Sequence, residues 1–123
     1  MRERDVEQYL VSEVRAIGGR AYKLACPGTN GMPDRMVCLP GGRIVFVELK
    51  APGKQARALQ RARQKALRDM GFTVFGAVDR PAMVDAIIDY CRELMGGNTI
   101  SDTADYFREL LVGVIPPSGG DGE

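Results

Sequence analysis

Histidine is absent from the 123 residues of this chain. Without an imidazole the chain has no Ser-His-Asp or Cys-His catalytic centre, no His-ligated zinc, and no histidine to act as base or nucleophile. Hydrolytic chemistry here would have to depend on carboxylates, lysine and a hard metal ion. This absence narrows the possible functions more than any other feature of the composition.

Cysteine is scarce: Cys26, Cys38 and Cys91 are an odd number of thiols, far apart, and no two form a CxxC pair. This spacing argues against a disulfide framework and against a zinc site. We expect all three to be reduced and to fill space as small apolar residues.

Long apolar runs are also missing, so we expect no membrane-spanning segment and no membrane partner. The first five residues, Met-Arg-Glu-Arg-Asp, lack the apolar stretch of a signal peptide. These features predict a cytoplasmic protein.

The net charge of +1 hides an uneven distribution. The stretch from Lys50 to Arg68 contains basic residues and no acid, whereas the chain after Asn98 has five acidic residues against one arginine. The basic residues of that stretch are Lys50, Lys54, Arg57, Arg61, Arg63, Lys65 and Arg68.

Hydrophobic periodicity predicts an α/β domain over residues 1–97 with the order α-β-β-β-α-β-α. Helices are expected at 2–17, 55–70 and 81–95, and strands at 20–25, 35–39, 43–49 and 72–78. A Pro-Gly-Gly turn should make the second and third strands an antiparallel hairpin, and the last strand should pair parallel after a crossover. The helix at 55–70 is predicted to turn its apolar residues inward: Leu59, Ala62, Ala66, Leu67 and Met70. Residues 98–123 are predicted to be an acidic tail, with a short helix over 102–111 followed by disordered residues.

Three residues suggest chemistry: Asp34 after Pro33, and Glu48 with Lys50 fourteen and sixteen residues later. Alternation along the strand puts Glu48 and Lys50 on one face, and the hairpin would bring Asp34 beside them. Two converging carboxylates favour a divalent cation, and oxygen ligands select Mg²⁺ or Mn²⁺. Such a centre could hydrolyse a phosphodiester. The spacing alone is equally compatible with a strand-end salt bridge between Glu48 and Lys50, with Asp34 capping a turn.

A longer stretch strengthens the catalytic interpretation. The segments Cys-Pro-Gly-Thr-Asn-Gly-Met-Pro-Asp-Arg (26–35), Pro-Gly-Gly-Arg (40–43) and Phe-Val-Glu-Leu-Lys-Ala-Pro-Gly-Lys (46–54), followed by Gln60, resemble the virus-type replication-repair nuclease (VRR-NUC) domain. That family belongs to the PD-(D/E)xK nuclease superfamily. The resemblance spans residues 3–90 and implies a restriction-endonuclease-like mixed sheet flanked by helices.

The resemblance also assigns roles. It implies that Asp34, Glu48 and the Leu49 carbonyl bind the metal and that Lys50 is the catalytic lysine. Glu7 would match the first-helix glutamate, a metal ligand directly or through water, and Gln60 the glutamine behind the active centre. Periodicity puts Glu7 at the edge of an apolar helix face, where a carboxylate needs a partner, but an ordinary exposed charge is also compatible and Glu13 has similar neighbours.

The basic stretch is a candidate DNA-binding surface. On a helix, Arg57, Arg61, Lys65 and Arg68 would share one side and could neutralise phosphates together with Lys54, although a solvated helix face is the alternative. Asn30 and Gly31, in the loop before Asp34, could approach a phosphate or simply build a turn. We expect readout of the DNA backbone and shape, not of bases.

By resemblance to small family members from phages and bacteria, the chain is expected to be an endonuclease for branched, Holliday-junction-like DNA. It would act as a homodimer in a phage-infected or bacterial cell, with no small-molecule cofactor. A flap- or nick-directed nuclease, a non-catalytic DNA-binding module of the same fold, and an assembly protein whose carboxylates form salt bridges are the alternatives.

Overall fold

The computed structural model describes residues 2–96, and its elements follow the predicted order. The predicted tail over 98–123 lies outside the described residues. None of the helices within residues 2–96 has both the length and the apolar character needed to cross a membrane. The helices are α1 (Glu3–Ala16), α2 (Ala58–Asp69) and α3 (Pro81–Met95), and the strands are β1 (Arg20–Lys23), β2 (Arg35–Leu39), β3 (Arg43–Leu49) and β4 (Thr73–Val78).

The four strands form one mixed sheet in the order β1-β2-β3-β4. β1 pairs antiparallel with β2, and β2 pairs antiparallel with β3, with Val37 opposite Val45. β4 pairs parallel with β3, because α2 carries the chain back to the end of the sheet at which β3 begins. The predicted hairpin and the predicted parallel last strand are both confirmed.

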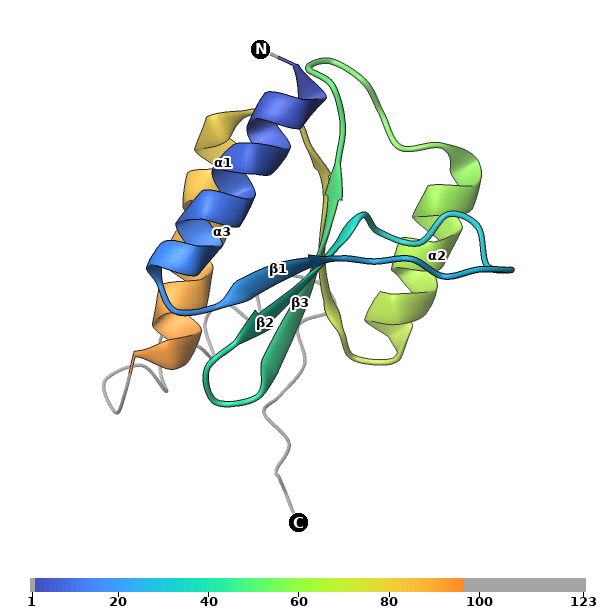
Figure 1. Ribbon diagram of the computed structural model, residues 1–123. Helices are drawn as coiled ribbons and strands as arrows, with labels where there is room; N and C mark the ends of the chain where they lie inside the picture. The colour runs from blue at the N-terminus through green and yellow to red at the C-terminus, as the bar shows by residue number, and fades with distance from the viewer. Residues whose placement is uncertain (1, 97–123) are drawn as a thin grey trace.

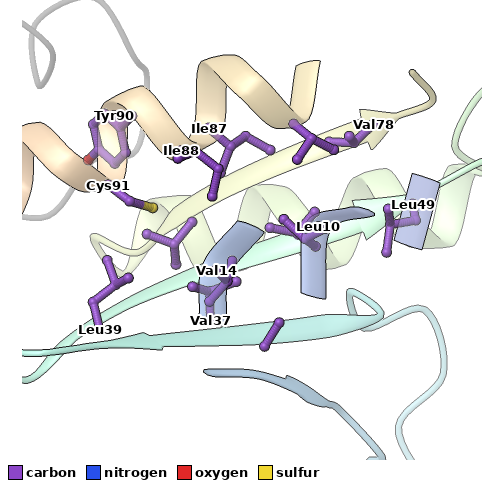
Figure 2. Packing of buried hydrophobic residues seen from close by; sticks show 14 of the residues in the cluster. Leu10, Val14, Val37, Leu39, Leu49, Val78, Ile87, Ile88, Tyr90 and Cys91 are labelled. Atoms are coloured by element: carbon purple, nitrogen blue, oxygen red, sulfur yellow. The ribbon is translucent and has the colours of Figure 1, made fainter. Parts of the chain in front are cut away.

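One face of the sheet is covered by α1 and α3, which lie side by side (Figure 1). Val6, Leu10 and Val14 recur at helical spacing along α1 and are completely buried. They meet the inward residues of β3 and the apolar side of α3, including Ile87 (Figure 2). This apolar cluster is the main core of the molecule.

The opposite face is covered by α2 alone (Figure 1). Its apolar cluster is small and centres on Phe46, Leu67 and Val74, with the rings of Phe46 and Phe72 edge to face at 5.6 Å. Of the α2 residues predicted to point inward only Leu67 is buried; Leu59 and Met70 are 47% and 66% exposed, and Ala62 and Ala66 are exposed as well.

The inward prediction was wrong because α2 covers a polar part of the sheet. Its buried side is formed by Gln64 and Leu67, with Gln60 half-buried beside them. α2 also begins at Ala58, three residues later than predicted. Arg57 is extended (φ −73°, ψ 164°), and its N–H donates to Gln60 Oε1 at 2.9 Å, so the Gln60 amide fixes the start of the helix.

The three cysteines are free thiols, as predicted. Cys91 is fully buried in the main core, whereas Cys26 and Cys38 are half-buried. Burial raises the pKa of the Cys91 thiol to about 12, so this group stays protonated at neutral pH and is no nucleophile.

Candidate active site

Asp34 stands immediately before β2 and reaches across to the end of β3. Its Oδ2 accepts a hydrogen bond from the Leu49 backbone N–H at 2.9 Å. Its own carbonyl accepts from the Leu24 N–H at 2.9 Å, which extends the β1–β2 pairing to this point. Pro33, just before it, is fully buried and fixes the approach of the chain. The Asp34 carboxylate is therefore held beside the Glu48-Leu49-Lys50 segment.

Glu48 points to the α2 face and is only 1% exposed. Its Oε2 accepts from Gln60 Nε2 at 2.7 Å and lies 3.1 Å from Lys50 Nζ. Its Oε1 is buried and has no hydrogen-bond partner within residues 2–96. A buried carboxylate oxygen without a donor or cation is costly, so this atom needs a ligand.

The pKa of Glu48 also indicates that its negative charge is not fully balanced by its neighbours. Burial, together with the negative charge of Asp34, raises the pKa of Glu48, and the neighbouring Lys50 ammonium partly offsets this rise. Two carboxylates that repel each other in a buried place form a site that a divalent cation would stabilise.

Lys50 lies on the same side of the strand as Glu48, with its side chain 15% exposed. Its backbone N–H donates to the Val78 carbonyl at 2.9 Å, which ties the end of β3 to β4. The loop that follows is held by Asp79, which accepts from the Gly53 N–H at 3.1 Å and from the Arg80 guanidinium. Hydrogen bonding to Arg80 lowers the pKa of Asp79. Nothing in the sequence alone pointed to this role of Asp79.

Gln64 is a second residue whose role the sequence alone did not indicate. Its side chain is 3% exposed, and its Nε2 has no acceptor within residues 2–96. A Cβ placed on Gly76 would lie 2.8 Å from this nitrogen and 2.9 Å from Glu48 Cβ. Gly76 is therefore required by close packing, because its missing side chain leaves room for Glu48 and Gln64. Only the pairing of β3 with β4 reveals this relation.

The Glu7 carboxylate pairs with Arg35, the residue that follows Asp34. Its Oε2 accepts from Arg35 Nε at 2.8 Å, and Arg35 also donates to the Ala21 carbonyl at 3.0 Å. No hydrogen bond or ion pair within residues 2–96 joins Glu7 to Asp34 or Glu48. The carboxylate at the edge of the apolar face thus has an arginine as its partner.

The basic residues around α2 are largely engaged in internal contacts. Arg61 donates to the Ala56 carbonyl, Arg68 to the Val74 carbonyl, and Lys65 pairs with Asp69 at 2.7 Å. The side chains of Lys54 and Arg57 are exposed.

The loop before Asp34 is packed against α2. The Asn30 carbonyl accepts from Arg63 Nε at 2.8 Å. Gly31 has φ +86°, and a Cβ there would lie 2.9 Å from Leu59 Cγ. These contacts hold the backbone of the loop, and the Asn30 side chain stays exposed.

The residues fit a hard cation in part. The described residues contain no group of three or more His, Cys, Asp or Glu side chains that could hold a metal ion. They do place two carboxylates together, one with a free buried oxygen. A Mg²⁺ or Mn²⁺ ion bound through few carboxylates would take its remaining ligands from backbone carbonyls, water and phosphate.

Comparisons with known proteins agree with this fold. The chain is 50% identical over 74 residues to "Putative nuclease p44" of Acyrthosiphon pisum secondary endosymbiont phage 1, a match that covers 60% of this chain and 80% of that protein. A solved structure described as "VRR_NUC domain" superposes with a TM-score of 0.66 at 34% identity, covering 71% of this chain and 94% of the other. No family model matches the sequence.

The mixed sheet, its three helices and the paired carboxylates are those of an α/β nuclease domain. The chain belongs to the VRR-NUC family.

Proposed function

We propose that this chain is a Mg²⁺- or Mn²⁺-dependent endonuclease that hydrolyses phosphodiester bonds in DNA. The observation that carries the proposal is the free, buried Oε1 of Glu48 beside the Asp34 carboxylate. Lys50 and Gln60 both contact Oε2 of Glu48, so the buried Oε1 is left for a further ligand.

In this proposal Asp34, Glu48 and the Leu49 carbonyl hold the cation. Once bound, the cation would activate water and neutralise charge on the phosphate. Gln60 keeps the Glu48 carboxylate in place through its 2.7 Å hydrogen bond, and the Gln60 amide is itself fixed by the Arg57 N–H. Glu7 enters as the partner of Arg35, the residue directly after Asp34, and so supports the start of β2.

In this proposal Lys50 stabilises the negative charge that develops on the phosphate in the transition state. One of its three N–H donors is used by Glu48, which leaves two for water or a phosphate oxygen. A fixed ammonium at this point stabilises negative charge in the transition state more strongly than water does.

The test is cleavage of labelled DNA in Mg²⁺ or Mn²⁺ by wild type, Asp34→Asn, Glu48→Gln and Lys50→Met. Asp34→Asn keeps an oxygen that can accept from the Leu49 N–H, so it removes charge with little change in geometry. Each variant should lose cleavage by on the order of 100-fold or more, while Asp69→Asn, at an exposed carboxylate, should not. Equal cleavage by the three site variants would exclude this site as the catalytic centre.

The finer proposal is that the substrate is branched, Holliday-junction-like DNA and that the enzyme works as a homodimer. A two-fold dimer would present two centres to a two-fold junction. Four-way, flap, nicked and linear DNA at equal concentration separate the junction enzyme from a flap- or nick-directed one, and light scattering measures the mass in solution. Binding without cleavage of any substrate would favour a non-catalytic DNA-binding module.

A further inference from the structure

The basic side chains within residues 2–96 differ in how many hydrogen bonds they form inside the protein. Around α2, Arg61, Arg63 and Arg68 each donate to a backbone carbonyl, and Asp69 returns a negative charge beside Lys65. Each of these contacts holds a side chain in place but leaves its positive charge and its other N–H donors available to a phosphate. A second surface that carries arginines is formed by α1 and the start of β2, and α1 lies across the sheet from α2 (Figure 1).

That surface contains a hollow of about 470 Å³ between α1 and the start of β2, here called the α1 hollow. Three guanidinium groups and one carboxylate face it, so its net charge is positive. Its lining residues are Arg4, Glu7, Gln8, Val11, Ser12, Arg15 and Arg35. Spacings of three and four residues put the α1 members on one side of the helix.

Several donors of the α1 hollow have no acceptor. Within residues 2–96, the side chains of Gln8, Ser12 and Arg15 make no hydrogen bond or ion pair. Arg35 uses Nε for Glu7 and Nη1 for the Ala21 carbonyl, which fixes the plane of its guanidinium. Its Nη2 is bonded to nothing in the same part of the chain. The hollow thus combines one rigid arginine with several free polar side chains.

Resting on the proposed function, we propose that the α1 hollow binds a backbone phosphate of the DNA, at a distance from the bond that is cut. A phosphodiester carries one negative charge and two free oxygens, each of which accepts more than one hydrogen bond. Guanidinium, amide and hydroxyl groups are the donors that proteins use for this group.

The position of the hollow supports this ligand. Arg35 directly follows Asp34, so one wall of the α1 hollow begins at the residue next to the proposed metal ligand. In this proposal a strand with one phosphate at Asp34 continues past Arg35 to α1. The hollow would then set the direction in which the strand crosses the active site.

The experiment measures binding of fluorescently labelled duplex and four-way DNA by anisotropy across a NaCl series. The parent protein is Asp34→Asn, so that the DNA stays intact. Into it are introduced Arg4→Gln with Arg15→Gln, or, as a matched pair of equal charge, Arg61→Gln with Lys65→Gln. All four substituted side chains are exposed, and circular dichroism confirms folding.

The α1 pair should weaken binding by about ten-fold or more, and it should lower the slope of log K against log salt by about 1 for each phosphate that the protein no longer neutralises. The α2 pair should weaken binding by less than about three-fold. Equal reductions in both pairs would attribute the effect to net charge, and weaker binding in the α2 pair alone would place the phosphate on α2. Either result overturns the proposal.

Failure of this inference is distinguishable from failure of the proposed function. If wild type neither cleaves nor binds any DNA, both are wrong. If wild type cleaves, and the α1 pair in the wild-type background keeps full affinity and cleavage, only the role of the α1 hollow is excluded.

Discussion

The two faces of the sheet are built on different principles. The face under α1 and α3 buries a large cluster of mainly aliphatic side chains, whose contacts stabilise the fold. The face under α2 buries three apolar residues together with Glu48 and Gln64, each of which has a buried polar atom without a partner within residues 2–96. One face is an apolar core, whereas the other contains buried polar atoms that lower its contribution to stability.

The largest effect is expected on the apolar face. Leu10→Ala should lower the free energy of unfolding by about 3 to 5 kcal/mol, because Leu10 is completely buried in the large cluster. The matched change Leu67→Ala, on the α2 face, should cost only about 2 kcal/mol, since its cluster is smaller. Urea unfolding of both variants measures the difference. A greater destabilisation at Leu67 would reverse the comparison.

The next largest effect is a gain in stability, expected at Glu48. Glu48→Gln in metal-free protein should raise the free energy of unfolding by about 1 to 3 kcal/mol, because it removes a buried charge with an unpartnered oxygen. Excess Mn²⁺ should reverse the order, since a cation at about 1,000 times its dissociation constant stabilises the wild type by about 4.1 kcal/mol. Thermal unfolding in EDTA and in Mn²⁺ tests both parts. A destabilised variant in EDTA would mean that Glu48 is an ordinary ion-pair partner.

A smaller gain is expected at Gln64. Gln64→Met keeps the volume of the side chain and removes an unsatisfied buried donor, so stability should stay equal or rise by up to about 1 kcal/mol. Gln60→Met is the control that should lose stability, because the Gln60 amide is bonded at both ends. Chemical denaturation compares the two. A marked destabilisation in Gln64→Met would show that its amide has a partner in solution.

The smallest effect is expected on the outer side of α2. Met70→Gln should change the free energy of unfolding by less than about 0.5 kcal/mol, because Met70 is 66% exposed. The measurement is best made at two protein concentrations. A larger, concentration-dependent decrease would mean that a second copy covers this side of α2.

Much of this architecture was predictable from the sequence. The regular spacing of Val6, Leu10 and Val14 identified α1, and the alternation along β3 correctly separated Phe46 and Glu48 from Val45 and Val47. Such patterns work where burial is apolar, because hydrophobic periodicity then reports the buried side directly.

The same rule gave the wrong side of α2. There the sheet presents Glu48, so the buried side of the helix carries the amides of Gln60 and Gln64, whereas Leu59 and Met70 are exposed. Likewise, the Glu7–Arg35 pair and the close approach of Gly76 to Gln64 depend on contacts between distant segments. Local sequence contains no information about such pairings until the strand register is known.

The hydrogen bond from the Leu49 amide to Asp34 has a practical consequence. Because a single backbone proton reports on the carboxylate that is proposed to hold the metal, its NMR frequency and its rate of exchange with deuterium should follow the state of that side chain. Titration of isotope-labelled protein with a diamagnetic cation would then allow occupancy to be followed at one resonance, without any substrate or catalytic turnover.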